Sequence, residues 1–196
     1  MVISGICIGC SSNAVLLTPE GVEVSVTSLS KEEAKRLNKM QDSLYHERAE
    51  KALKSSNFVL EAERLSHERG NSEAVSLVTN FVAVTGNQAV IQFAPSMSGG
   101  VNDMGGATFG GKTSNVKITT DKHGGATYSM IVSSAGLSAM VVVRLSGGSD
   151  RATAEIKTNY NQFAVKLEGE IVPSSASKAY YSGSTSTDKL IQGLSK

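Results

Sequence analysis

Apolar and polar residues alternate with a period of two in a series of short runs between residues 57 and 173. Turn-forming groups such as Thr85-Gly86-Asn87 separate the runs. Alternation of this kind places one side of a strand in a core and the other in water, and short turns suit hairpins. We therefore predict antiparallel strands at 58–62, 80–84, 89–93, 116–120, 127–132, 137–145, 152–156 and 163–172, with a shorter run at Val75 and Leu77.

The last of these strands shows the pattern clearly. Val165, Leu167 and Ile171 fall on one side of it and are predicted to face the core, whereas Glu168 and Glu170 fall on the other side. Together the runs predict a mainly β domain of about seven to nine antiparallel strands, which closes as a sandwich or as a partly closed barrel.

One amphipathic helix is predicted before the strands. Ser30 can cap an amide of the first helical turn and Glu33 can reach back to Ser30, so the helix begins there and runs to about Lys54. Its apolar stripe is thin and the remainder is charged. Such a helix either lies across a sheet by its narrow side or stands in solvent as a spacer. The stripe consists of Leu37, Met40, Leu44, Ala52 and Leu53.

The glycine-rich stretch from Gly99 to Ile118 predicts the one long connection between strands. Glycines let a chain turn through positive φ and pass close to neighbouring backbone, which is the structural explanation that we favour. A ligand-binding loop is the alternative, because connections of this length are often functional. The candidate residues of this loop are Asn102, Asp103, Gly105, Gly106, Thr108 and Asn115.

Residues 106–113 also satisfy the phosphate-loop pattern G-x-x-x-x-G-K-[ST]. That chemistry requires a strand before the loop and a helix after it, so that backbone amides converge on the phosphates. Here glycine-rich sequence precedes the motif, and the alternating sequence SNVKITT follows it. We therefore expect no bound nucleotide and no cofactor.

Residues 1–13 form an apolar segment without Lys or Arg. Its end resembles the end of a bacterial lipoprotein signal, because Gly9 precedes Cys10 and serines follow, although Cys7 stands where Leu is usual. We interpret the segment as a remnant of a signal peptide, with Cys10 as the candidate for lipidation. A leader without this role is the alternative. The C-x-x-C pair of Cys7 and Cys10 lacks the second ligand pair that a zinc site needs.

The chain is predicted to hold a single domain with flanking segments. Residues 1–13 are the leader remnant and residues 14–29 a tether or short strand. Residues 30–173 form the β-domain with its helix at 30–55, and residues 174–196 form a Ser-rich flexible tail.

Composition narrows the classes of function. The 196 residues include 19 Lys and Arg against 18 Asp and Glu, and a net charge of +1 is too small to hold a polyphosphate backbone, so nucleic acid is excluded as a partner. His46, His67 and His123 each lack a second ligand at metal spacing, so no metal site is expected. Glu168 and Glu170 have no catalytic counterpart, and no G-x-S-x-G motif occurs, so we predict no catalytic residues.

From about Lys31 to Pro173 the chain resembles the domain-of-unknown-function 4251 family. The residues that carry this resemblance are Asn57 to Leu65, Thr79 to Val84, Asn102 to Gly111 with Ser114 and Asn115, and Gly169 to Pro173. The resemblance implies an exported protein of a Bacteroidota-type bacterium and a location in the cell envelope. It implies no activity, because the family has none assigned.

These observations predict an exported protein that is not an enzyme, located in the periplasm or anchored to the outer membrane as a lipoprotein. We expect it to bind a small apolar or glycan ligand, or another envelope component, through a sheet face or the open end of the barrel. Membrane attachment would occur only through a lipid on Cys10. Two alternatives stay open: a hydrolase of envelope polymers with its site in the loop 99–114, and a structural spacer held out by the charged helix.

Overall fold

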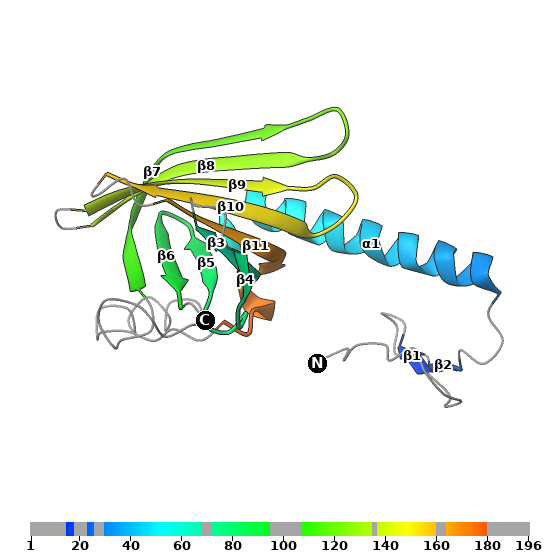
Figure 1. Cartoon of the computed structure of the whole chain (residues 1–196). Helices are drawn as coiled ribbons and strands as arrows, with labels where there is room; N and C mark the ends of the chain where they lie inside the picture. The colour runs from blue at the N-terminus through cyan, green and yellow to red at the C-terminus, as the bar shows by residue number, and fades with distance from the viewer. Residues whose placement is uncertain are drawn as a thin grey trace. The chain divides into compact units, whose positions relative to one another are not determined.

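The computed structural model describes residues 15–17, 23–25, 30–67, 72–94, 107–134, 137–159 and 164–179 (Figure 1). The chain divides into two compact units, residues 1–41 and 42–196. The elements are β1 (Val15–Leu17), β2 (Glu23–Ser25), α1 (Lys31–Lys54), β3 (Asn57–His67), β4 (Ser72–Ala74), β5 (Phe81–Thr85), β6 (Gln88–Phe93), β7 (Ala107–Thr120), β8 (Ala126–Ser134), β9 (Leu137–Leu145), β10 (Arg151–Thr158), β11 (Ala164–Pro173) and a 3-10 turn (Ser174–Ala176).

The start of α1 confirms the predicted cap. The amide of Ser30 donates to Oε2 of Glu33 at 2.9 Å, and the amide of Glu33 donates back to Oγ of Ser30 at 3.3 Å. This exchange satisfies two amides that the first helical turn leaves without a backbone acceptor. Within the part of the chain that the structure describes, no helix combines the length and the hydropathy needed to cross a bilayer.

The apolar stripe predicted on α1 divides into two parts. Leu37, Met40 and Leu44 are exposed, whereas Ala52 and Leu53 are buried in the core of the second unit. The last turns of the helix therefore pack by their narrow side, as one of the two predicted arrangements requires.

Eight strands close an antiparallel barrel, and β4 lies beside β3 as an extra short strand. The order around the barrel is β3, β5, β6, β7, β8, β9, β10 and β11, and β11 then pairs with β3 (Figure 1). In this closing pair Leu167 lies opposite Leu65. Of the two closures predicted from the sequence, the barrel is therefore the one that forms.

Large side chains fill the interior of the barrel. Val165, Leu167 and Ile171 of β11 are buried, as predicted, and every other barrel strand contributes to the same apolar cluster. A barrel of this strand number is just wide enough inside for side chains to fill. The largest fully buried side chains of the cluster are Tyr128, Phe58, Leu53, Leu60, Leu65, Ile91, Met130 and Leu167.

Along one edge, β3 pairs first with β5 and then with β4. β5 pairs with residues 57–61 and β4 with residues 64–66. On its other side, the ladder with β11 skips Glu63, because Ala62 lies opposite Gly169 and Arg64 lies opposite Glu168. This is a β-bulge, and it brings the two backbones so close that a Cβ atom on Gly169 would overlap the carbonyl oxygen of Glu61.

Asn80 bridges the place where β5 gives way to β4. Its side chain is fully buried, and its Oδ1 accepts from the amide of Ala94 at 2.7 Å. Its Nδ2 donates to the carbonyl oxygens of Ser76 at 2.9 Å and Ala94 at 3.2 Å. The backbone carbonyl of Asn80 accepts from the amide of Ala62 at 2.8 Å. A buried amide with this many partners holds the barrel wall together.

Two predicted boundaries were wrong. β7 begins at Ala107, so residues expected in the glycine-rich connection belong to a strand. Glycine suits that strand because a Cβ atom on Gly111 would overlap the carbonyl oxygen of Ser133 on β8. Likewise, β4 covers Ser72–Ala74, and Val75 follows it. Since residues 107–120 form a strand, the rejection of a phosphate loop at 106–113 is confirmed for the described part of the motif.

Candidate binding surfaces

The barrel interior holds few polar atoms, and its principal hydroxyl has a partner. The ring of Tyr128 meets that of Phe58 edge to face, with centroids 5.1 Å apart. The Tyr128 hydroxyl lies 3.0 Å from Oγ of Ser56, where the chain leaves α1. Burial raises the pKa of Tyr128, so the phenol stays neutral. The arrangement is that of a packed core, and binding groups are to be sought on the outside.

Two outer surfaces carry most of the charge of the described barrel strands. The first, which we call the acidic seam, lies where β3 and β11 close the barrel. Alternation along both strands sends apolar side chains inward and charged ones outward. The acidic seam comprises Glu61, Glu63, Arg64, Asp150, Arg151, Lys166, Glu168 and Glu170.

Arg151 is the centre of the acidic seam. Its Nη1 donates to Oε2 of Glu63 on β3 at 2.8 Å and to Oε1 of Glu170 on β11 at 3.2 Å. The hydrogen bond to Glu63 is the main cause that raises the pKa of Arg151. One guanidinium thus links β10, β11 and β3 across the closing pair of strands. Because all three side chains are nearly half exposed, the network adds only modest stability.

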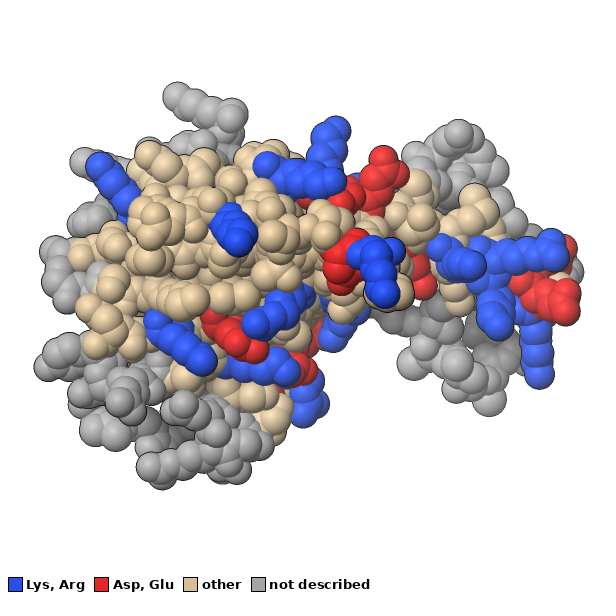
Figure 2. Space-filling view, turned by 90° about the horizontal axis from the view of Figure 1, so that it is seen from above, with Lys and Arg blue, Asp and Glu red and all other residues tan. Residues whose placement is uncertain are grey.

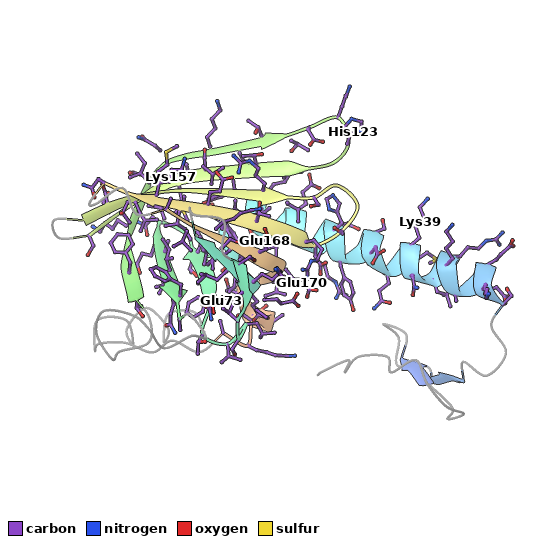
Figure 3. All side chains as sticks on the ribbon, in the orientation of Figure 1. Lys39, Glu73, His123, Lys157, Glu168 and Glu170 are labelled. Atoms are coloured by element: carbon purple, nitrogen blue, oxygen red, sulfur yellow. The ribbon has the colours of Figure 1, made fainter. Side chains whose placement is uncertain are left out.

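The carboxyl groups of the acidic seam differ in pKa. Burial raises the pKa of Asp150 and of Glu170, and the charge of Asp150 adds to the rise at Glu170. By contrast, the hydrogen bond from Lys166, whose Nζ lies 2.6 Å from Oε1 of Glu168, lowers the pKa of Glu168. Figure 3 labels Glu168 and Glu170 on β11. Raised carboxyl pKa values occur at catalytic sites and also in structural ion networks.

The surroundings favour a structural role for the acidic seam. Nδ1 of His46 on α1 lies 2.8 Å from the carbonyl oxygen of Ser149, so the helix is tied to the turn that precedes Arg151. Oε1 of Glu61 accepts from Oγ of Ser177 at 2.7 Å and from the amide of Lys178 at 2.5 Å. Across the described residues, no three His, Cys, Asp or Glu side chains gather in a way that could hold a metal ion.

The contacts of Glu61 also fix the start of the predicted tail. Residues 174–179 lie against the outside of β3 and β5, and Ala179 packs on an apolar cluster there. The remainder of the predicted tail, with Tyr180 and Tyr181, lies outside the described residues. The members of this outer cluster are Val59, Phe81, Ala83, Val90, Val172 and Ala179.

The second surface, which we call the basic face, is formed by the outward side chains of β7 to β10. Seen from above, this part of the molecule is largely uncharged, with Lys and Arg side chains standing out and fewer Asp and Glu (Figure 2). The outward positions follow from the register, in which Ile131 lies opposite Met140 and Met140 opposite Lys157. The basic face comprises Lys112, Lys117, Ile131, Met140, Val142, Arg144, Glu155 and Lys157.

The cations of the basic face are paired less completely than those of the acidic seam. Arg144 pairs with Glu155 across β9 and β10 at 2.8 Å. Of the carboxylates that the structure describes, none lies within ion-pair distance of Lys112, Lys117 or Lys157. The cause is the register, since the residues directly opposite these lysines are serines, glutamine, methionine or alanine. Among the residues that the structure describes, these three ammonium groups therefore have no acidic partner.

The structure does not bring the described residues of the predicted ligand loop together. Thr108 lies near the start of β7, where its Oγ1 donates to Oε1 of Gln92 at 3.4 Å. Asn115 lies at a bulge of the same strand, with φ of 50°. At the usual rise per residue the two are on the order of 20 Å apart. Asn102, Asp103, Gly105 and Gly106 lie outside the described residues, as does the lipidation candidate Cys10.

Sequence reasoning missed both charged surfaces. The period of two had already placed Glu168 and Glu170 on the wet side of one strand, and that prediction is confirmed. What alternation alone could not supply is which strands are neighbours and in what register. A search for outward positions on strands joined by short turns, charged and apolar alike, would have found Lys157 and Met140, which lie opposite one another on β10 and β9.

The fold and these surfaces define a class: a small closed antiparallel barrel with a packed core, entered by the end of one helix. The chain belongs to the DUF4251 family, described as a domain of unknown function, whose model matches residues 40–171. It is similar to the crystal structure of a DUF4251 family protein from Bacteroides eggerthii DSM 20697. The two share 33% sequence identity with a TM-score of 0.64, over 71% of this chain and 94% of that chain. No curated protein matches this chain.

Proposed function

We propose that this chain is an exported, non-enzymatic protein of the cell envelope whose barrel binds another envelope component through its outer surface. The observation that carries the proposal is the packed interior. Side chains from all the barrel strands and from the last turns of α1 fill it, among them Leu53, Phe58 and Tyr128. A small ligand inside would have to displace these side chains, whereas a partner on the outside would displace only water.

The proposal of export rests on the leader and on the family resemblance. Gly9-Cys10 followed by serines resembles the end of a lipoprotein signal, and a relative of known structure comes from Bacteroides. A lipid on Cys10 would hold the chain at a membrane and bring the barrel close to other envelope components.

The proposal that the chain is not an enzyme rests on how the carboxylates of the acidic seam are paired. In the acidic seam Glu63 and Glu170 accept from Arg151, and Glu168 accepts from Lys166. Carboxylates that neutralise cations within the same surface hold strands together. A hydrolase would instead present a carboxyl pair to its substrate.

Cell fractionation combined with metabolic labelling tests export and lipidation. Cells that make the chain are fed an alkyne fatty acid, and Cys10→Ala is compared with Cys7→Ala as the matched control. We expect label in the membrane fraction for the unmodified chain and for Cys7→Ala, and loss of the label for Cys10→Ala. Recovery of an unlabelled chain in the cytosol would overturn the proposal.

Thermal unfolding in the presence of palmitate tests the packed interior. A ligand that binds only the folded barrel raises the melting temperature with its concentration. We expect no rise, because the interior positions are already occupied. A rise that grows with palmitate concentration and disappears in a variant with a bulkier interior, such as Ala154→Phe, would show that the barrel opens for a ligand.

A further inference from the structure

The basic face has an apolar centre surrounded by lysines. One row across four strands runs Ser114, Ile131, Met140 and Lys157, each directly opposite the next. Met140 has 54% of its surface exposed and is one of the few large apolar side chains that the described barrel leaves in water. Because Lys157 lies opposite Met140, its alkyl stem can lie along the methionine while the ammonium group stays in solvent.

The spacing of the lysines suits an extended partner. Lys112 and Lys117 lie opposite Ser133 and Ser129 of β8, which are four residues apart, so the two lysines are separated by roughly 13 Å along the strand. Lys157 lies on β10, three strand spacings or roughly 14 Å away. A single small anion can touch only one ammonium group at these separations. A surface that carries many anions can satisfy all of them together.

The composition of the basic face distinguishes between extended partners. Lysine is a compact point charge that attracts phosphate groups without fixing their orientation, as a fluid array of headgroups requires. Exposed apolar side chains among lysines gain most where they can enter the boundary between headgroups and acyl chains. A fully hydrated polymer offers no such boundary to Met140.

We propose that the basic face docks onto the surface of an anionic lipid bilayer, with Lys112, Lys117 and Lys157 at the headgroups and Met140 between them. The inference rests on the proposed envelope location. The lipid proposed on Cys10 would hold the chain at a membrane, and the basic face would direct the barrel onto the headgroups of that membrane.

Vesicle co-sedimentation tests the docking with the full chain lacking its lipid. One arm uses vesicles of phosphatidylcholine alone, and the other uses phosphatidylcholine mixed with phosphatidylglycerol. We expect binding to the mixed vesicles that weakens as salt is added, because the attraction to lysines is screened. Equal binding to both kinds of vesicle would overturn the inference.

The contribution of the lysines is measured by a triple change with a matched control. Lys112→Gln/Lys117→Gln/Lys157→Gln removes three charges from the basic face and should lower the affinity for mixed vesicles about a hundredfold. Lys31→Gln/Lys35→Gln/Lys39→Gln removes three exposed charges from α1 and should leave most of the affinity. Equal losses in the two triple variants would show that net charge alone governs binding and would refute the assignment to this face.

The contribution of Met140 separates a bilayer from a hydrated polyanion. Met140→Gln should lower the affinity for mixed vesicles about fivefold and leave binding to dextran sulfate unchanged. Met40→Gln, at an exposed methionine of α1, is the matched control and should change neither. An unchanged affinity of Met140→Gln for vesicles, or binding to dextran sulfate without binding to mixed vesicles, would replace the bilayer with an anionic polymer.

The result is separable from that of the proposed function. All substituted side chains are exposed, so each variant should melt within a few degrees of the unmodified chain. An exported chain that ignores mixed vesicles would overturn the docking and leave the envelope function standing. A chain confined to the cytosol would overturn the envelope function whatever the vesicles show.

Discussion

The acidic seam and the basic face are built by the same alternation of strand residues but use their charges differently. In the acidic seam, Arg151 lies directly opposite Glu170 and reaches Glu63 one strand further. On the basic face, Lys157 lies opposite Met140. Charge alone does not decide what a side chain does here. What matters is the residue that the register places opposite the charged side chain. An opposite charge gives an ion pair between barrel strands, whereas a neutral residue leaves the charge open to a partner.

Single glycines of the two surfaces differ in how closely a neighbouring backbone approaches them. Around the barrel, β8 is the strand furthest from β3 in either direction. The bulge in the acidic seam forces Gly169 against the carbonyl of Glu61, whereas Gly110 on β7 has only ordinary neighbours. Gly111, the next residue of β7, is as closely held as Gly169, because a Cβ atom there would overlap the carbonyl oxygen of Ser133. We infer that tolerance to added bulk differs from one glycine to the next on both surfaces, with Gly169 intolerant and Gly110 tolerant.

The largest effect is expected when a methyl group is added at the closing pair. In Gly169→Ala the new Cβ would overlap the Glu61 carbonyl, so β11 and β3 could not keep their ladder, and the free energy of unfolding should fall by about 4 kcal/mol or more. In Gly110→Ala the nearest atoms lie at 3.7 Å, and the change should stay within about 1 kcal/mol. Urea unfolding of both variants measures the difference. Equal losses would show that the backbone of Glu61 does not restrict position 169 more than ordinary neighbours restrict position 110.

The second largest loss of stability is expected when a buried side chain of the core is shortened. Leu167→Ala removes a fully buried side chain beside the closing pair and should lower the free energy of unfolding by about 2–5 kcal/mol. Met140→Ala, on the outer side of β9, should change it by less than about 0.5 kcal/mol. Both values come from the same urea titrations. A large loss at Met140 would mean that the basic face is part of the core and not a free surface.

Loss of the central guanidinium should have a smaller effect. Arg151→Met leaves Glu63, Glu170 and Asp150 without their nearest cation and should lower the free energy of unfolding by about 1 kcal/mol, which is a few degrees in melting temperature. Lys157→Met, matched in chemistry, should leave the melting temperature unchanged because no described acid pairs with Lys157. Calorimetry on the two variants would contradict the comparison if Lys157→Met proved the more destabilising.

The smallest expected effect is a pH dependence of opposite sign at two neighbouring acids of β11. The pKa of Glu170 is raised in the folded chain by burial, so the folded state holds this proton more tightly than the unfolded state does. The resulting stability is present below the ordinary value of 4.5 and is lost as pH rises through the raised pKa. The unmodified chain should therefore lose stability relative to Glu170→Gln as pH rises above 4.5.

Glu168 supplies the control for that experiment. Its pKa is lowered by Lys166, so its stabilising contribution is present above the ordinary value and is lost as pH falls through the lowered pKa. The unmodified chain should lose stability relative to Glu168→Gln on acidification. Melting curves recorded both below and above pH 4.5 decide both points. The same sign for the two variants would mean that the surroundings of the two carboxyls have been assigned incorrectly.

Much of the fold could be predicted from local sequence. The cap at Ser30 and Glu33, the turn at Gly86 and the inward set of Val165, Leu167 and Ile171 all depend on residues close together in the chain. Each signal has a short-range physical cause, either a hydrogen bond within one helical turn, a positive φ or the pleat of a strand. These features were therefore open to sequence analysis and agree with the structure.

The closure and the surfaces could not be predicted in the same way. Pairing of β3 with β11 joins Leu65 to Leu167, from the first and the last strand of the barrel, and no local pattern reports such a contact. The glycines of β7 were interpreted as a loop, because the reason for Gly111 is an oxygen on another strand. The ion network of Arg151 likewise exists only once the barrel has closed. What sequence analysis missed was in each case a relation between distant segments.

Lysine acetylation, measured residue by residue with and without mixed phosphatidylcholine and phosphatidylglycerol vesicles, tests the contrast between the two surfaces most directly. Lys112, Lys117 and Lys157 represent the basic face, and Lys166, paired with Glu168, represents the acidic seam. We predict that vesicles slow acetylation at the first three lysines and leave the rate at Lys166 unchanged. Equal slowing at all four lysines, or slowing at Lys166 alone, would contradict the claim that the basic face contacts the vesicles and the acidic seam does not.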